Sequence, residues 1–294
     1  MVVRWALGLL AALVAAAPQA GATRTVYVTA AAADGSPLVS LDAADLVVKE
    51  GDQVRKILRV EPSRAKLRVA IAVEELLAPD NEVRRALANF IDQIRESGEL
   101  ALYTVGRRMD RRVDYTSEIV PFANAINKFP ARAIEPGDLV QALQEIARDQ
   151  RSREGRHAIV TVATQTAQVS TVTAEAVLEQ LTAGRTVLYA ATLAGSETST
   201  IPSGATSGGR RLELEGQVSG LERDKVFSGG TKQSGGLHLT SQRTTGLWAS
   251  LERIAVELTH QYVVSYEADL RSGGTMTIES ARRTVTVRGP TRAK

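Results

Sequence analysis

The chain has 294 residues, of which 44% are hydrophobic, with a formal net charge of +3 and no cysteine. This length can bury a proper core, divided between one medium domain and a small one. The small charge, without a dense basic stretch interleaved with aromatics, argues against a nucleic-acid partner. The missing cysteines exclude disulfides and lipid attachment through an N-terminal cysteine, so we expect packing alone to hold the fold.

The first residues have the pattern of a secretory signal peptide. Arg4 precedes an apolar segment from Trp5 to Ala17, and Ala20-Gly21-Ala22 is a small-residue cleavage motif. The apolar segment is shorter than the ~20 residues that span a bilayer, and no other segment could span one. We therefore expect residues 1–22 to be cleaved and the protein to be exported, either periplasmic or secreted. The alternative is that the segment stays as a membrane anchor.

A small β unit is predicted from residues 23–65. Alternating polar and apolar residues predict strands at 25–29, 45–49 and 54–60 near the start, and at 262–266 and 283–288 near the end. Gly51 supplies the positive φ of a hairpin turn. Strands this short cannot enclose a core alone, so we expect residues 261–290 to complete the unit.

Strands and helices alternate through residues 66–260. Apolar runs predict buried strands at 67–73, 100–105, 158–163 and 186–191, a short edge strand at 111–115, and helices at 83–94, 119–129, 139–147, 173–181 and 248–258. Such repeats imply parallel strands joined by right-handed crossovers. The predicted fold class is α/β: a doubly wound, mostly parallel sheet with helices on both faces, plus a small β-sandwich-like unit from the terminal strands.

Residue types at the ends of these segments sharpen the boundaries. Polar capping residues predict helix starts at Asp80 or Asn81, Asp138 and Thr173. Glycines predict helix ends at Gly98 and Gly184. From Gly195 to Gly236 the composition shifts to Gly, Ser and Thr, which predicts a mobile insertion broken by a short helix near 212–223. Trp248 and Leu251, at helical spacing, are expected to face the core.

Three short motifs appear in a definite order along this pattern. They are Leu41 to Gly51 in the first hairpin, Arg156 to Val160 in a sheet strand, and Ser234-Gly235-Gly236 followed by Gln261 to Tyr266. Their order resembles a von Willebrand factor type A (VWA) domain, in particular the exported variant of that family found widely in acidobacteria. The resemblance covers nearly the whole mature chain and implies a non-enzymatic module that binds another protein.

Family members that bind through a metal-ion-dependent adhesion site use Asp-x-Ser-x-Ser after the first strand, a Thr in a second loop and an Asp after the fourth strand. By the resemblance, these positions fall on Glu74, Leu76, Ala78, Gly137 or Asp138, and Thr164. Mg²⁺ requires near-octahedral oxygen ligation, and leucine and alanine side chains supply no oxygen. We therefore expect a degenerate site with no metal and no cofactor.

The loops after parallel strands converge at the carboxyl edge of a sheet, which is where ligands of such folds bind. We expect a partner protein of unknown identity to contact the loops 74–79, 135–139 and 164–168. The candidate binding residues there are Glu74, Glu75, Leu76, Leu77, Asp138 and Thr164. The first loop has no glycine, which argues against phosphate binding. The alternatives are that the two glutamates are a solvated pair and that the leucines pack beneath their own loop.

Two other functions remain open on the same residues. One is a metal-dependent adhesin that uses Glu74 and Asp138 with backbone oxygens, and the other is a carboxylate-dependent hydrolase in which these two carboxylates converge. A zinc site is disfavoured because His157, His238 and His260 lack ligand spacing. No Gly-x-Ser-x-Gly elbow supports a serine hydrolase.

Overall fold

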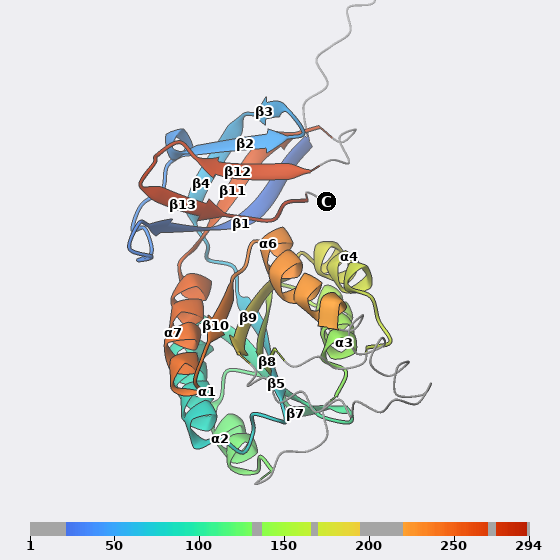
Figure 1. The fold of residues 1–294 in the computed structure, drawn as a ribbon. Coiled ribbons are helices and arrows are strands. Elements are labelled where there is room, and N and C mark those ends of the chain that lie inside the picture. Colours follow the sequence, from blue (N-terminus) through green and yellow to red (C-terminus); the bar gives the residue numbers. More distant parts are fainter. Residues whose placement is uncertain (1–21, 131–136, 166–169, 195–219, 270–274, 293–294) are drawn as a thin grey trace, which may run out of the picture.

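The computed structural model describes residues 22–130, 137–165, 170–194, 220–269 and 275–292. Figure 1 shows a unit of β-strands above an α/β unit, and strands from both ends of the described chain lie in the upper one. The predicted signal peptide (residues 1–21 of it) and residues 195–219 of the predicted insertion lie outside the described residues. Within the described residues, no helix is long and apolar enough to cross a membrane.

The α/β unit is built on a six-stranded sheet in the order β10-β9-β8-β5-β6-β7. Its strands are β5 Leu67–Glu74, β6 Gly98–Val105, β7 Met109–Thr116, β8 Arg156–Thr164, β9 Val187–Leu193 and β10 His238–Ser241. All neighbours pair in parallel except β6 and β7, which pair antiparallel, and β7 is an edge strand because it stands at one end of the order. This confirms the predicted fold class. Central β5 is apolar over almost its whole length because both of its faces are covered.

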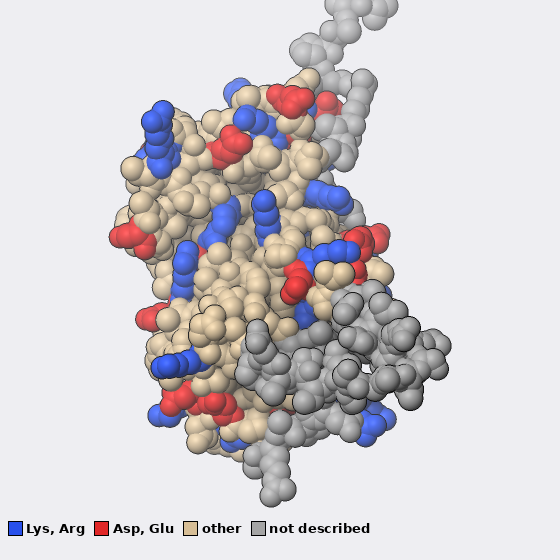
Figure 2. Space-filling view, in the orientation of Figure 1, with Lys and Arg blue, Asp and Glu red and all other residues tan. Residues whose placement is uncertain are grey.

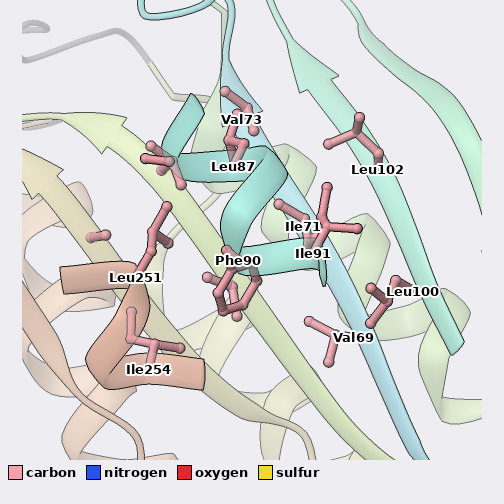
Figure 3. Close-up of a cluster of buried hydrophobic side chains, with 14 of the residues drawn as sticks. Val69, Ile71, Val73, Leu87, Phe90, Ile91, Leu100, Leu102, Leu251 and Ile254 are labelled. Carbon is pink, nitrogen blue, oxygen red and sulfur yellow. The ribbon is translucent and has the colours of Figure 1, made fainter. Parts of the chain in front are cut away.

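Helices cover both faces of this sheet. They are α1 Asn81–Ile94, α2 Ile119–Asn127, α3 Leu139–Arg151, α4 Ala174–Gly184, α6 Thr231–Ser234 and α7 Thr245–Thr259. Helices α1, α2 and α7 enclose one core with the sheet, and Figure 3 shows Leu251 and Ile254 of α7 beside Phe90 of α1 in that core. Helices α3 and α4 enclose a second core on the other face of the sheet. Each large side chain buried in these cores contributes roughly 1.5–3 kcal/mol.

Three predicted helix starts and one predicted end are confirmed, and the other predicted end needs correction. Asp80 caps α1, and its Oδ1 accepts the backbone N–H of Glu82 at 2.7 Å; Asp138 and Thr173 cap α3 and α4. Gly98 is the first residue of β6, after a short 3₁₀ turn, so it does not end α1. The end of α4 at Gly184 is confirmed, and the residue just after it, Arg185, is left-handed, with φ of 50°.

Residues 220–234 form a continuous helix, which corrects the prediction of a mobile insertion for this part of it. Lys225–Gly230 is its π-helical segment, and α6 is its last turn. Glycine and serine are poor helix formers, but Val226 and Phe227 are fully buried in the core under α4. Packing of this apolar face outweighs the weak local propensity, because tertiary contacts supply most helical stability in proteins.

The prediction that Trp248 faces the core is wrong, whereas the one for Leu251 is confirmed. Trp248 is 41% exposed and Leu251 is 1% exposed. The buried stripe of α7 runs through Leu247, Leu251, Ile254 and Leu258, at intervals of three and four residues. Trp248 lies one position outside that stripe, so its ring reaches the surface.

The β unit contains two sheets, with strand orders β13-β1-β11-β4 and β12-β2-β3. Their bounds are β1 Ala22–Ala32, β2 Leu46–Glu50, β3 Gln53–Arg55, β4 Ile57–Pro62, β11 Gln261–Ala268, β12 Met276–Ser280 and β13 Val285–Arg288. As the pattern predicted, strands from the two ends of the chain pair: β1 runs antiparallel to β11, from Ala22 opposite Ala268 to Thr29 opposite Gln261. A separate apolar core lies between the sheets. Strand β12 was not predicted.

Buried polar contacts join the two units. The Nη1 of Arg156, at the start of β8, donates to the carbonyl of Leu258 at 2.9 Å and to Oε1 of Gln261 at 2.5 Å. Burial lowers the pKa of Arg156. Farther along, the backbone N–H of Thr291 donates to the carbonyl of Gln233 at 2.8 Å. The start of β11 and the segment after β13 are thereby fixed to the α/β unit.

We predict that Gly235→Ala destabilises the protein more than Gly51→Ala. Both glycines have positive φ, 86° and 58°, so alanine is strained at either site by about 1–2 kcal/mol. A Cβ at Gly235 would also lie 2.7 Å from the carbonyl carbon of Gly289, whereas one at Gly51 meets nothing within 4 Å. Urea unfolding measures both variants, and equal losses would contradict the docking of helix 220–234 against the segment after β13.

Candidate functional site

The carboxyl edge of the central sheet brings Glu74 and Thr164 together. They end β5 and β8, which are parallel neighbours with Val73 opposite Val162. The backbone N–H and the Oγ1 hydroxyl of Thr164 donate to Oε2 of Glu74 at 2.6 and 3.0 Å. The strand register thus brings the ends of β5 and β8 into direct hydrogen-bonded contact.

Arg223, from helix 220–234, completes this arrangement. Its Nη2 donates to Oε1 of Glu74 at 2.7 Å and to the carbonyl oxygen of Thr164 at 2.5 Å. The side chains of Arg223 and Glu74 are 3% and 1% exposed, so this is a buried ion pair. The guanidinium carbon also lies 5.1 Å from the ring centroid of Phe227, one helical turn later. A cationic side chain therefore neutralises the carboxylate at the end of the central strand.

Glu75 is buried as well, and it has its own arginine. Nη2 of Arg112, on edge strand β7, donates to Oε1 of Glu75 at 3.1 Å, and its Nε donates to Oγ1 of Thr104 at 2.9 Å. Both glutamates are thus paired and at most 5% exposed. The alternative of a solvated glutamate pair is therefore wrong, because each carboxylate has an arginine from a distant part of the chain.

The loop that follows folds back on itself in tight turns. The backbone N–H of Leu77 donates to the carbonyl of Glu74, and that of Ala78 to the carbonyl of Glu75. Leu77 is buried in the core with Ala78, so it packs beneath its own loop and is not accessible to a partner. Leu76 is partly exposed. Of the two candidate leucines, only Leu76 reaches the surface.

Gly137 and Asp138 lie in a second cluster of the same edge. A Cβ at Gly137 would lie 1.6 Å from the carbonyl oxygen of Gly106, so the two backbones touch and no side chain fits between them. The carboxylate of Asp138 accepts from the N–H of Gln141 at 2.9 Å, from Oγ of Ser170 at 2.8 Å and from the N–H of Thr171 at 2.9 Å. Asp138 therefore holds a helix start and a loop. Residues 135, 136 and 166–168 of the candidate loops lie outside the described residues.

The donor set at Glu74 does not suit a divalent cation. Of the motif positions, Leu76, Ala78 and Gly137 carry no side-chain oxygen, and the carboxylate of Glu74 is already bonded to Arg223 and Thr164. Across the described ranges, no group of three His, Cys, Asp or Glu side chains could hold a metal ion. Glu74 and Asp138 bond to different partners, and no hydrogen bond or ion pair between described residues joins them. Both carboxylates thus serve as hydrogen-bond acceptors within the fold.

The three histidines also lie apart. Nδ1 of His157 is 3.2 Å from the carbonyl of Gly184, Nε2 of His238 is 2.8 Å from Oγ1 of Thr192, and Nδ1 of His260 is 2.8 Å from the carbonyl of Val256. Burial lowers the pKa of His238, which favours its neutral form. Each imidazole ring thus has its own hydrogen-bond partner, at a separate place in the fold.

Sequence reasoning missed Arg223 and Arg112. A usable signal existed for the first: Arg223, Val226, Phe227 and Gly230 follow the i, i+3, i+4, i+7 spacing of a helix face. That face places an arginine on the apolar side of a helix, where a buried charge needs a partner. Nothing in the local sequence identifies Glu74 as that partner, because the two residues are 149 positions apart.

Comparison with known proteins gives structural matches of low identity. No family model matches this chain, and no curated protein matches it. BatB from Bacteroides thetaiotaomicron is 14% identical over 64% of this chain and 97% of its own, with a TM-score of 0.43. Proximal thread matrix protein 1 from the mussel byssus is 11% identical over 77% of this chain and 50% of its own, with a TM-score of 0.46. The VWA domain of SpRpn10 is 10% identical over 62% and 93%, with a TM-score of 0.39. The fold class of this chain rests on its own strand order and register.

We predict that Arg223→Met lowers the free energy of unfolding by about 3–5 kcal/mol, because it leaves the buried Glu74 carboxylate without its cation. Adding Glu74→Gln to that variant removes the unpaired charge, so the double variant should recover much of the loss. Arg112→Met is the matched control at the neighbouring pair, where the arginine is 36% exposed and the loss should be smaller. Denaturant unfolding of the wild type, the single variants Arg223→Met and Glu74→Gln, and the double variant gives the coupling energy, and additive losses would show that the pair does not act as a unit.

Proposed function

We propose that this protein is an exported, non-enzymatic protein–protein interaction module of VWA-like fold that has lost metal-dependent adhesion. One observation carries the proposal: the guanidinium of Arg223 is bonded to Glu74 and to the carbonyl of Thr164. These are the first and last positions of the adhesion motif in the resemblance to VWA domains. The cation at this site is therefore a side chain of the protein itself.

A divalent cation competes poorly with that arrangement. Mg²⁺ needs six oxygen ligands at 2.0–2.1 Å, and three motif positions here offer no side-chain oxygen. Binding would also require Arg223 to leave Glu74, and a charged guanidinium stranded in a buried site carries a desolvation penalty of several kcal/mol. The missing ligands and the cost of displacing Arg223 therefore disfavour a metal-dependent adhesin that uses Glu74 and Asp138.

The partner surface that we propose is the carboxyl edge around the ion pair. Leu76 lies two residues after Glu74 and is partly exposed, and Leu221 lies two residues before Arg223 and is 60% exposed. Exposed leucines beside a buried ion pair suit the apolar centre of a protein interface better than a catalytic pocket. Glu75 and Leu77 are buried, so they support this surface from below without forming part of it. The signal-peptide pattern of the first residues supports export.

We predict that millimolar Mg²⁺ or Mn²⁺ leaves the melting temperature of the wild-type protein unchanged. A ligand that binds only the folded state at a hundredfold excess over its Kd adds roughly 2.7 kcal/mol of stability. In a chain of this size that would raise the melting point by about 2–4 °C, which differential scanning calorimetry resolves. A rise of this size that Glu74→Ala abolishes would restore the metal-dependent adhesin.

We also predict that Leu76→Asp weakens capture of the partner from a periplasmic fraction, with and without a chelator. An added charge at the centre of an apolar interface must be desolvated without a counter-ion, which costs a hot-spot position about 2 kcal/mol or more. Val54→Asp is the matched control, because Val54 is an exposed valine of the β unit, far from this edge in the fold. Quantitative pull-down compares the variants. Undiminished capture by Leu76→Asp, or capture that the chelator abolishes, would contradict the proposal.

A further inference from the structure

A pocket opens at the opposite edge of the central sheet, between the β unit and the α/β unit. Its walls come from β1, the last turns of α4, the first residue of β9, the end of helix 220–234 and the segment after β13. Val187 in this wall begins β9, whereas Glu74 and Thr164 end their strands. The pocket is therefore separate from the carboxyl edge, and the inference drawn from it does not depend on the proposed function.

The chemistry of the lining is apolar with positive charge. Val26, Leu178, Leu181 and Val187 form the apolar part of the wall. Three arginines line the same pocket, Arg24, Arg185 and Arg292, and none of the described residues that line it is Asp or Glu. Figure 2 shows Lys and Arg side chains along the middle of the molecule, at the level where the two units meet. A ligand with an apolar body and a negative charge is complementary to this lining.

The three arginines are not equivalent. Nη1 of Arg24 donates to the buried carboxylate of Glu50 at 2.8 Å, so its charge is largely balanced. Arg185 is the left-handed residue that ends α4, and its side chain is exposed. Arg292 is exposed near the end of the described chain. Arg185 and Arg292 are therefore the exposed arginines of this lining.

Hydrogen bonds hold the walls in place without a ligand. Nε2 of Gln233 donates to Oγ1 of Thr182 at 3.2 Å, and Oγ of Ser234 accepts the backbone N–H of Leu188 at 2.9 Å. The N–H of Thr291 donates to the carbonyl of Gln233 at 2.8 Å. Helix 220–234 is thus fixed to α4, to β9 and to the chain after β13. A preformed pocket avoids the entropy cost of ordering its walls when a ligand binds.

The volume of the pocket limits the ligand. It encloses about 60 Å³. In this measure one water molecule needs about 10–15 Å³, so the pocket has room for only a few water-sized groups. We propose that the pocket binds a short aliphatic carboxylate, with its carbon chain against Leu178 and Leu181 and its carboxylate at Arg185 and Arg292. The same chemistry is offered by a free short-chain acid and by the C-terminal valine or leucine of a polypeptide.

The test is direct titration of the full chain with butanoate, followed by NMR. We expect butanoate to bind, with affinity rising about fourfold for each methylene from acetate to butanoate, as burial of about 0.8 kcal/mol per methylene requires. Butanol and butylammonium, which lack the negative charge, should bind at least about tenfold more weakly. No binding of butanoate at millimolar concentration, or equal binding of butanol, would overturn the proposal.

Variants connect the binding to the two arginines. Arg185→Asn removes the charge and keeps a residue type that tolerates the left-handed conformation, and Arg292→Gln changes an exposed position, so both should fold. Each is expected to weaken butanoate at least about tenfold, whereas Arg243→Gln, an exposed arginine outside the pocket, leaves affinity unchanged. Wild-type affinity in the double variant Arg185→Asn/Arg292→Gln would overturn the assignment.

N-acetyl-valine and N-acetyl-valinamide distinguish the two sources of the carboxylate. If a polypeptide end is the natural ligand, N-acetyl-valine binds more tightly than butanoate, and its amide, which lacks the charge, does not. If a free acid is the ligand, butanoate binds more tightly than N-acetyl-valine. Either order supports a carboxylate pocket, and equal binding of the acid and the amide contradicts it.

Discussion

The buried ion pair of Glu74 and Arg223 is the constraint on which the rest of the α/β unit depends. Glu74 ends a strand whose other residues, apart from Arg68, are apolar and buried, and it is itself only 1% exposed, so its carboxylate has little access to water. A carboxylate in that position needs a cation and hydrogen-bond donors, and here it obtains them from Arg223 and from Thr164. In a metal-dependent site, a divalent ion and its ligands would meet this need. Here the chain supplies the charge, which ties helix 220–234 to the carboxyl edge.

That helix connects the two ends of the sheet. Arg223 lies at the carboxyl edge, and Gln233 and Ser234, less than a dozen residues later, help to form the pocket at the opposite edge. Between them Val226 and Phe227 fill the core beneath α4. The same helix therefore pairs with Glu74 at the carboxyl edge, packs on one face of the sheet and contacts the chain after β13. Its glycine-rich and serine-rich sequence folds because these tertiary contacts, and not local propensity, stabilise it.

How far the sequence predicts this structure depends on how local each interaction is. The apolar run of β5, the cap at Asp80 and the stripe of α1 follow from neighbouring residues, and the structure agrees with the predictions made from them. Predictions failed where contacts between distant residues determine the structure. Glu75 pairs with Arg112, Leu77 packs in the core, and Arg223 pairs with Glu74, 149 positions away. Trp248 and Leu251 differ only in their positions around the axis of α7. The composition of residues 195–236, rich in Gly, Ser and Thr, argued against the helix that residues 220–234 form. Parallel pairing of distant strands creates these contacts, so no local window contains them.

The measurement that tests the central claim most directly is a crystal structure of the protein grown with millimolar Mn²⁺, with anomalous diffraction data. The account predicts that the guanidinium of Arg223 lies on Glu74 and on the carbonyl of Thr164, as in the present structure. It also predicts no anomalous peak at coordination distance, about 2.2 Å, from the carboxylate of Glu74. A manganese peak bonded to Glu74, with Arg223 turned away from it, would contradict the claim that a side chain has replaced the metal.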